Sequence, residues 1–270
     1  MTETTQPRIH VIQNADDVGL DLLAPGLDGA QLEVVHPYRG DALPAVEDVH
    51  ALIVLGGAAN AYDDEAKPYL PQLRDLLSAA VDRDVPTLAV CLGAQLLAVA
   101  RGGQVHVAAP AGAEIGVIEV RLRPDAERDV VLGPLVAAKG ATVQVPSLHM
   151  DAITELPEGA CWLAASRQYP FQAFRIGSAL GVQFHPEVSG TMLASWIRRH
   201  GLEDAERIAD EVRAQWDASA QEITEVADLL SRAFAAQVAA QVREQTAAQV
   251  GAQTGPQVGK QVGTLEPLGT

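Results

Sequence analysis

Aromatic residues make up only 4% of the 270-residue chain, so Ala, Val and Leu must supply most of its core. Basic residues are scarce too: 19 Lys and Arg stand against 35 Asp and Glu, which gives a formal net charge of −16. A surface this acidic repels nucleic-acid phosphates and anionic lipid headgroups. We therefore expect neither a nucleic acid nor a membrane as partner.

The chain contains only two cysteines, Cys91 and Cys161, too few for a disulfide framework, which favours a reducing compartment. Cys161 stands beside Trp162 and Leu163, so we expect it in the core. No uncharged apolar run approaches the roughly 18 residues of a membrane span, and residues 1–14 lack the apolar core of a signal peptide. We expect a cytoplasmic protein.

The sequence contains no motif for a phosphate-binding loop or a metal site. The chain contains no GxxxxGK[ST] motif, so nothing indicates a phosphate-binding loop of its own. The remaining histidines are scattered without metal-ligand spacing. We predict no metal and no cofactor.

Apolar segments of strand length alternate with helical patterns over residues 8–200. Such alternation predicts an α/β fold with an open, mainly parallel central sheet and helices on both faces. The predicted strands are 8–14, 31–37, 50–57, 86–90, 105–107, 116–122 and 179–184, and the clearest helices are 68–84 and 91–100.

From about residue 201 the composition changes. An acidic segment with helix-spaced apolar residues predicts a C-terminal amphipathic helical extension over 201–250. We expect it to pack on the main domain, with a partner-binding helix as the alternative. In residues 251–270, Gly recurs at every fourth position from Gly251 to Gly263 and Pro256 is present, which predicts a low-complexity flexible tail.

Cys91 is the first candidate for chemistry. It stands between an apolar strand and a helix, where helix N–H groups favour the nucleophilic thiolate. The small residues Ala89 and Gly93 flank it, as a strand–nucleophile–helix elbow requires. A buried, inert cysteine is the alternative reading of this residue alone.

The tetrapeptide FHPE supplies a matching base. Pro186 favours an extended backbone at His185, and in extended chain residues i and i+2 point to the same side. Glu187 can then orient the imidazole of His185, as the third member of a catalytic triad does. A solvated histidine and a surface glutamate are the alternative.

Gly56 and Gly57 end another apolar strand. Glycines there let backbone N–H groups approach a ligand and, with the N–H of Leu92, suit an oxyanion hole. The glycine pair, Cys91 and His185 each follow an apolar strand, and ligands bind at the carboxyl ends of parallel strands. These three segments are expected to meet at one edge of the sheet.

Five segments occur in a characteristic order: LGGAANAYDDE (55–65), PTLAVCLGAQLLA (86–98), AEIG (113–116), LHMDAITELPEGACWLAAS (148–166) and QAFRIGSALGVQFHPEV (172–188). Together they resemble class I glutamine amidotransferase domains, with a Cys-His-Glu triad and a flavodoxin-like fold. The resemblance covers about residues 8–200. It is strongest to free-standing members akin to the glutaminase domain of GMP synthase.

The resemblance implies a role for each matched position. Cys91 would be the nucleophile, His185 the general base and then acid, and Glu187 the residue that orients His185. Gly57 and Leu92 match the oxyanion positions, and Gly56 precedes them. Gln95 matches a glutamine-contacting position, and His149 and Asp151 match an H-x-D segment that lines the same pocket.

Two positions depart from the family pattern. Ala89 stands two residues before the nucleophile, where the family usually has Gly. Met150 stands between His149 and Asp151, where Gly is frequent. Neither change removes a catalytic group, but the side chain of Met150 could reshape the pocket.

Three functions follow as hypotheses. The first is hydrolysis of the glutamine side-chain amide to glutamate and ammonia, with the ammonia passing to an acceptor such as a separate synthetase. The second is a γ-glutamyl hydrolase that uses the same triad on γ-glutamyl amines or peptides. The third is a non-catalytic regulatory or binding subunit of the same fold, against which the intact triad argues.

Overall fold

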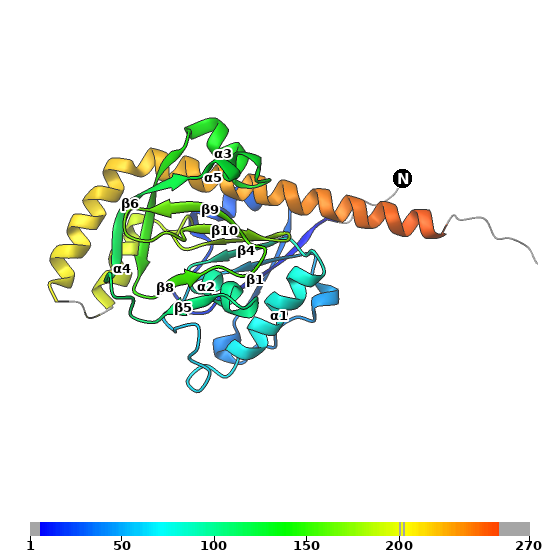
Figure 1. The fold of residues 1–270 in the computed structure, drawn as a ribbon, viewed down its shortest axis with the longest axis horizontal. Coiled ribbons are helices and arrows are strands. Elements are labelled where there is room, and N and C mark those ends of the chain that lie inside the picture. The colour runs from blue at the N-terminus through cyan, green and yellow to red at the C-terminus, as the bar shows by residue number, and fades with distance from the viewer. Residues whose placement is uncertain (1–5, 200, 202, 254–270) are drawn as a thin grey trace, which may run out of the picture.

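The computed structural model describes residues 6–199, 201 and 203–253. A nine-stranded sheet lies at its centre, in the order β2-β1-β3-β4-β11-β10-β9-β6-β7 (Figure 1). The predicted fold class is confirmed.

The first half of the sheet is parallel. It comprises β1 (Arg8–Ile12), β2 (Gln31–Val35), β3 (Ala51–Val54), β4 (Thr87–Val90) and β11 (Ala179–Val182). In β3, β4 and β11 every residue is buried, which matches the continuous apolar runs by which they were predicted.

The second half is antiparallel. It comprises β10 (Ala173–Ile176), β9 (Cys161–Ser166), β6 (Glu114–Leu122) and β7 (Thr142–His149). A separate small sheet pairs β5 (Gln104–His106) with β8 (Ala152–Glu155). The sequence analysis identified neither β7, β8, β9 nor β10. It also placed Cys161 in the core, which is wrong: at the start of β9 this side chain is exposed, whereas Leu163, two residues on, is buried.

Helices cover both faces of the sheet. Two helices, α1 (Leu70–Asp82) and α2 (Leu92–Ala100), pack with Leu52, Val54 and Ala89 on one face. On the other, Ile9, Ile53 and Val182 pack in one cluster with the 3-10 turn η1 (Asp21–Leu27), α3 (Leu132–Lys139), α4 (Gly190–Arg199) and α5 (Ala205–Gln253). Further 3-10 turns are η2 (Pro37–Arg39), η3 (Val46–Asp48) and η4 (Pro124–Arg128).

The C-terminal extension is one continuous helix, α5. Its residues Val212, Val226, Leu230 and Phe234 are buried in the same cluster as Ile9 of β1. Its C-terminal end extends beyond the rest of the molecule (Figure 1). The helix passes the predicted boundary at residue 250 and continues to Gln253. Residues 254–270, the rest of the predicted tail, lie outside the described residues. No helix in the described part of the chain is long and apolar enough to cross a membrane.

Candidate active site

Cys91 occupies a sharp elbow between β4 and the first turn of α2. Its backbone has φ 51° and ψ −109°, a conformation that non-glycine residues rarely adopt and that often marks functional sites. The Cys91 N–H donates to the Val182 carbonyl over 2.8 Å, which ties the elbow to β11. A Cβ at Gly93 would lie 2.2 Å from the carbonyl oxygen of Val54, so only glycine permits this close approach.

His185 follows β11 and is buried beside the elbow. Its N–H donates to the Pro146 carbonyl over 2.8 Å, and its Nδ1 lies 2.7 Å from Oε1 of Glu187, which is fully buried. Burial lowers the pKa of His185, but the carboxylate of Glu187 and the neighbouring thiol of Cys91 outweigh burial. The pKa therefore lies well above the usual 6.5, and the protonated imidazole is favoured.

Gly56 and Gly57 close one side of this centre. A Cβ at Gly56 would lie 3.0 Å from Cε1 of His185 and 3.5 Å from Cβ of Cys91, so both side chains flank this glycine. Gly57 lines the cavities around Cys91. The glycine pair, Cys91 and His185 therefore lie close together at the ends of three strands, as expected.

Two pockets open at Cys91 and share Gly57, Ala58 and Leu148 as walls. The first, called here the polar pocket, has a volume of about 170 Å³. Besides the shared walls it is lined by Leu92, Gln95, His149, Met150 and Asp151. The structure thus brings the glutamine-contacting candidates together on one side of the Cys91 sulfur.

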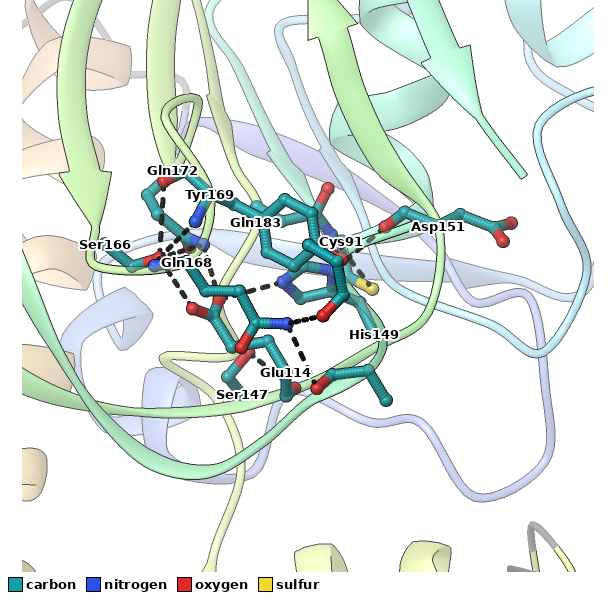
Figure 2. Close-up of polar contacts among 12 residues, drawn as sticks. Cys91, Glu114, Ser147, His149, Asp151, Ser166, Gln168, Tyr169, Gln172 and Gln183 are labelled. Carbon is teal, nitrogen blue, oxygen red and sulfur yellow. Dashed lines mark hydrogen bonds and ion pairs between the residues drawn. The ribbon is translucent and has the colours of Figure 1, made fainter. Parts of the chain in front are cut away.

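A buried polar network holds the polar pocket in shape (Figure 2). Glu114 stands opposite His149 across the β6–β7 pair, and its Oε2 lies 3.0 Å from Nε2 of the imidazole. The same carboxylate accepts hydrogen bonds from Ser166 Oγ and from Gln172 Nε2, each 2.6 Å long. His149 Nδ1 lies 2.9 Å from the Asp151 carbonyl, which fixes the H-x-D segment.

Gln183 links the polar pocket to Cys91. Its Nε2 lies 3.6 Å from the Cys91 sulfur (Figure 2). Its Oε1 accepts a hydrogen bond from Gln95 Nε2 over 3.2 Å. Gln95 Nε2 also donates to the Asp151 carbonyl over 3.1 Å. Sequence reasoning missed Gln183, although the i, i+2 rule that pairs His185 with Glu187 also places it on the same side.

The second pocket, called here the apolar pocket, lies on the His185 side of Cys91 and has a volume of about 270 Å³. Ala15 and Val18, which follow β1, and Trp196 of α4 form its walls. The Trp196 ring meets the imidazole of His185 edge-on at 5.1 Å, and its Nε1 donates to the Asp17 carbonyl over 3.1 Å. Nothing in the sequence indicated Trp196, because α4 reaches the site only through tertiary packing.

The family follows from a comparison with known proteins. The family model "Glutamine amidotransferase class-I" matches residues 27–204. The chain therefore belongs to the class I glutamine amidotransferase family, which confirms the predicted family and class of enzyme.

Individual relatives agree with this assignment. The chain is 37% identical over 154 residues to GMP synthase [glutamine-hydrolyzing] of Thermomicrobium roseum, and the match covers 57% of this chain and 26% of that protein. It is 30% identical over 197 residues to the Corynebacterium jeikeium protein of the same name, covering 67% of this chain and 34% of the relative. The chain thus spans only a minor part of the length of these relatives.

Solved structures show the same fold. A glutamine amidotransferase from Thermotoga maritima superposes with a TM-score of 0.74 at 23% identity, over 85% of this chain and 98% of that one. A glutamine amidotransferase from Methylobacillus flagellatus gives 0.73 at 25% identity, over 86% and 95%.

Proposed function

We propose that this chain hydrolyses the side-chain amide of glutamine through a thioester on Cys91, giving glutamate and ammonia. One observation carries the proposal: a cysteine in a strained strand–helix elbow lies beside a buried histidine whose Nδ1 is held by a buried glutamate. A nucleophile, a base and an orienting carboxylate are the parts that amide hydrolysis by covalent catalysis requires.

The first half-reaction forms the thioester. The Cys91 sulfur attacks the side-chain carbonyl carbon of glutamine while His185 carries a proton. The resulting oxyanion accepts hydrogen bonds from the backbone N–H groups of Gly57 and Leu92. The carbon–nitrogen bond then breaks, and His185 gives its proton to the departing nitrogen, which leaves as ammonia.

The second half-reaction regenerates the enzyme. A water molecule attacks the thioester, and His185 accepts one of its protons. Collapse of the second tetrahedral intermediate releases glutamate and returns the Cys91 sulfur. Glu187 keeps Nδ1 of His185 protonated throughout, so that Nε2 faces the reacting atoms.

The polar pocket is the proposed site for the glutamate part of the substrate. Gln95, His149 and Asp151 lie there beside the Cys91 sulfur, and Glu114 holds the imidazole of His149 in place. Met150 lines the same pocket, so its side chain limits the volume that the substrate can occupy.

The ammonia acceptor is proposed to be a separate synthetase protein. The relatives are named GMP synthase [glutamine-hydrolyzing], and the match covers 26% of the length of the first of them. In this proposal the chain supplies ammonia and the partner carries out the synthetic step. The compartment is proposed to be the cytoplasm, where such a partner and free glutamine would meet the chain.

The test is ammonia release from L-glutamine by the purified chain, alone and with candidate synthetase partners. A diazoketone analogue of glutamine should label the protein, and the label should be lost in Cys91→Ser. If the folded chain shows neither turnover nor labelling with any partner, the non-catalytic binding subunit is the correct function.

A further inference from the structure

Gln183 is a buried polar residue beside the Cys91 sulfur, and the mechanism above gives it no task. The residue is 1% exposed, and its backbone N–H donates to the Gln172 carbonyl over 2.9 Å, which fixes the chain just after β11. Burying an amide costs free energy unless its polar atoms are hydrogen-bonded. The nitrogen and the oxygen of the Gln183 side chain therefore each need a partner.

The partner of the nitrogen is the sulfur. Nε2 of Gln183 lies 3.6 Å from Sγ of Cys91, within hydrogen-bond distance of a sulfur acceptor (Figure 2). A neutral thiol is a weak acceptor, whereas a hydrogen bond to an ionised acceptor is roughly twice as strong as one between neutral groups. The amide N–H therefore stabilises the thiolate of Cys91, which is the nucleophilic form.

A chain of hydrogen bonds determines which end of the Gln183 amide faces the sulfur. The Asp151 carbonyl can only accept, so Gln95 presents its Nε2 to it over 3.1 Å. The same Nε2 donates to Oε1 of Gln183 over 3.2 Å, which leaves Nε2 of Gln183 facing Cys91. With the Gln183 amide reversed, two N–H₂ groups would face each other and an oxygen would face the sulfur.

The titratable groups around Cys91 line the two pockets. They are His185, Asp17 and Arg199 in the apolar pocket, and His149 and Asp151 in the polar pocket. Asp17 pairs with Arg199, and His149 pairs with Glu114. His185 therefore supplies the positive charge beside the sulfur, whereas Gln183 supplies a neutral donor whose own charge does not change with pH.

We propose that Gln183 is a catalytic residue that donates a hydrogen bond to the Cys91 thiolate, and that Gln95 holds the Gln183 amide in the orientation this requires. The inference rests on the proposed function, since it gives Gln183 a task in the attack on glutamine. Gln95 also lines the polar pocket, so a substrate bound there touches the other end of the same hydrogen-bonded chain. One chain of amides thus joins the substrate pocket to the reacting sulfur.

The first test is alkylation of Cys91 by iodoacetamide from about pH 5 to pH 10, which needs no glutamine. Gln183→Met removes the amide and keeps nearly the length of the side chain. Because the thiolate is the reacting form, we expect the pH of half-maximal rate to be about 1–2 units higher in Gln183→Met than in the wild type. An unchanged profile in this variant overturns the inference.

Two controls accompany this test. Peptide mass spectrometry separates Cys91 from the exposed Cys161, whose profile should not shift in any variant. The matched variant is Gln237→Met, which removes a 2.9 Å hydrogen bond from Nε2 to the Ser178 carbonyl at a position that lines neither pocket. It should leave the Cys91 profile unchanged, and a shift equal to that of Gln183→Met would overturn the inference.

The second test concerns the orienting role of Gln95. Gln95→Met should shift the Cys91 profile in the same direction as Gln183→Met, because the Gln183 amide is then free to turn. In the double variant the shift should equal that of Gln183→Met alone, since both changes act through one hydrogen bond. Two shifts that add overturn the orienting role. If Gln183→Met does not fold, Gln95→Met tests the inference by itself, and an unchanged profile overturns it.

Turnover of glutamine separates this inference from the proposed function. In Gln183→Met, kcat/KM for glutamine should fall by about 10–100-fold, the effect of losing one hydrogen bond to a charged group. An active wild type with an equally active Gln183→Met overturns the inference and leaves the proposed function standing. A wild type that releases no ammonia with any partner overturns the proposed function, and the alkylation profiles still decide whether Gln183 stabilises the thiolate.

Discussion

Glu187 Oε1 lies 2.7 Å from Nδ1 of His185, and both side chains are buried. A carboxylate in this position selects one tautomer of the imidazole and stabilises its protonated form. The ring is held further by the edge of Trp196. In the proposed mechanism the three residues contribute differently: the sulfur of Cys91 forms the bond, His185 moves the proton, and Glu187 orients the ring.

The first prediction concerns these three residues. Cys91→Ala and His185→Ala should each lower kcat/KM for glutamine by about 10⁴-fold or more, because each removes a group that takes part in bond making. Glu187→Gln should lower it by about 10²-fold, since the base remains but its orientation and charge balance change. Steady-state ammonia release measures all three, with circular dichroism as the folding control. A larger loss in Glu187→Gln than in the other two would contradict the assigned roles.

The second prediction concerns pH. Because the folded-state pKa of His185 is raised above its unfolded value near 6.5, protonation of His185 stabilises the folded chain. That contribution is complete below pH 6.5 and is lost as the pH rises through the raised pKa.

An NMR titration of the His185 ring protons should therefore show a pKa well above 6.5 in the wild type. In both Cys91→Ala and Glu187→Gln the pKa should be lower, since each loses a partner that raises it. Urea unfolding across the same pH range should show the smaller decline in Glu187→Gln. A wild-type pKa at or below 6.5 would contradict this prediction.

The third prediction concerns the elbow. Gly93→Ala should destabilise the protein by about 1–3 kcal/mol, because the new Cβ would overlap the carbonyl oxygen of Val54. Helix propensity alone predicts the opposite result: alanine is a better helix former than glycine, so Gly93→Ala would stabilise the protein. The matched control is Gly29→Ala, where nothing lies within 4 Å of an added Cβ and no loss is expected. Urea unfolding of both variants checks the sign.

The fourth prediction concerns the polar pocket. Glu114→Gln should raise KM for glutamine and cost about 1–3 kcal/mol of stability, because an amide N–H₂ would replace an oxygen that accepts hydrogen bonds. Glu119→Gln, at an exposed position of the same strand, is the control and should change neither quantity. An unchanged KM in Glu114→Gln would show that the network does not position the H-x-D segment.

Three strands of the parallel half, β3, β4 and β11, could be predicted because they are short, fully buried runs that are followed by unusual residues. Cys91 and His185 stood out for the same reason, although more than 90 residues separate them in the chain. The H-x-D segment and Gln95 came from the resemblance to a family, and their meeting with Cys91 could not have been deduced from local pattern.

The antiparallel half was harder, because its strands give no uniform local signal: β7 and β10 are largely buried, whereas β9 is partly exposed. The burial pattern of β9 changes along the strand, so that Cys161 is exposed beside the partly buried Trp162. Glu114 lies in one of the five segments that carry the family resemblance. A carboxylate in a strand, however, gives no local signal that a histidine on the neighbouring strand will face it. Trp196 and Arg199 reach the apolar pocket only because α4 packs there.

The middle of the helix α5 packs against the beginning of the chain. A Cβ at Gly26 of η1 would lie 1.9 Å from Oγ of Ser231, and Phe234 shares a cluster with Ile9 of β1. During synthesis on a ribosome, the apolar residues of β1 and η1 emerge long before α5. At about 5–20 residues per second, roughly 10–40 s pass before the residues of α5 that pack on β1 and η1 are synthesised. Throughout that interval the apolar surface of β1 and η1 lacks this cover, and transiently exposed surface of this kind is prone to aggregate.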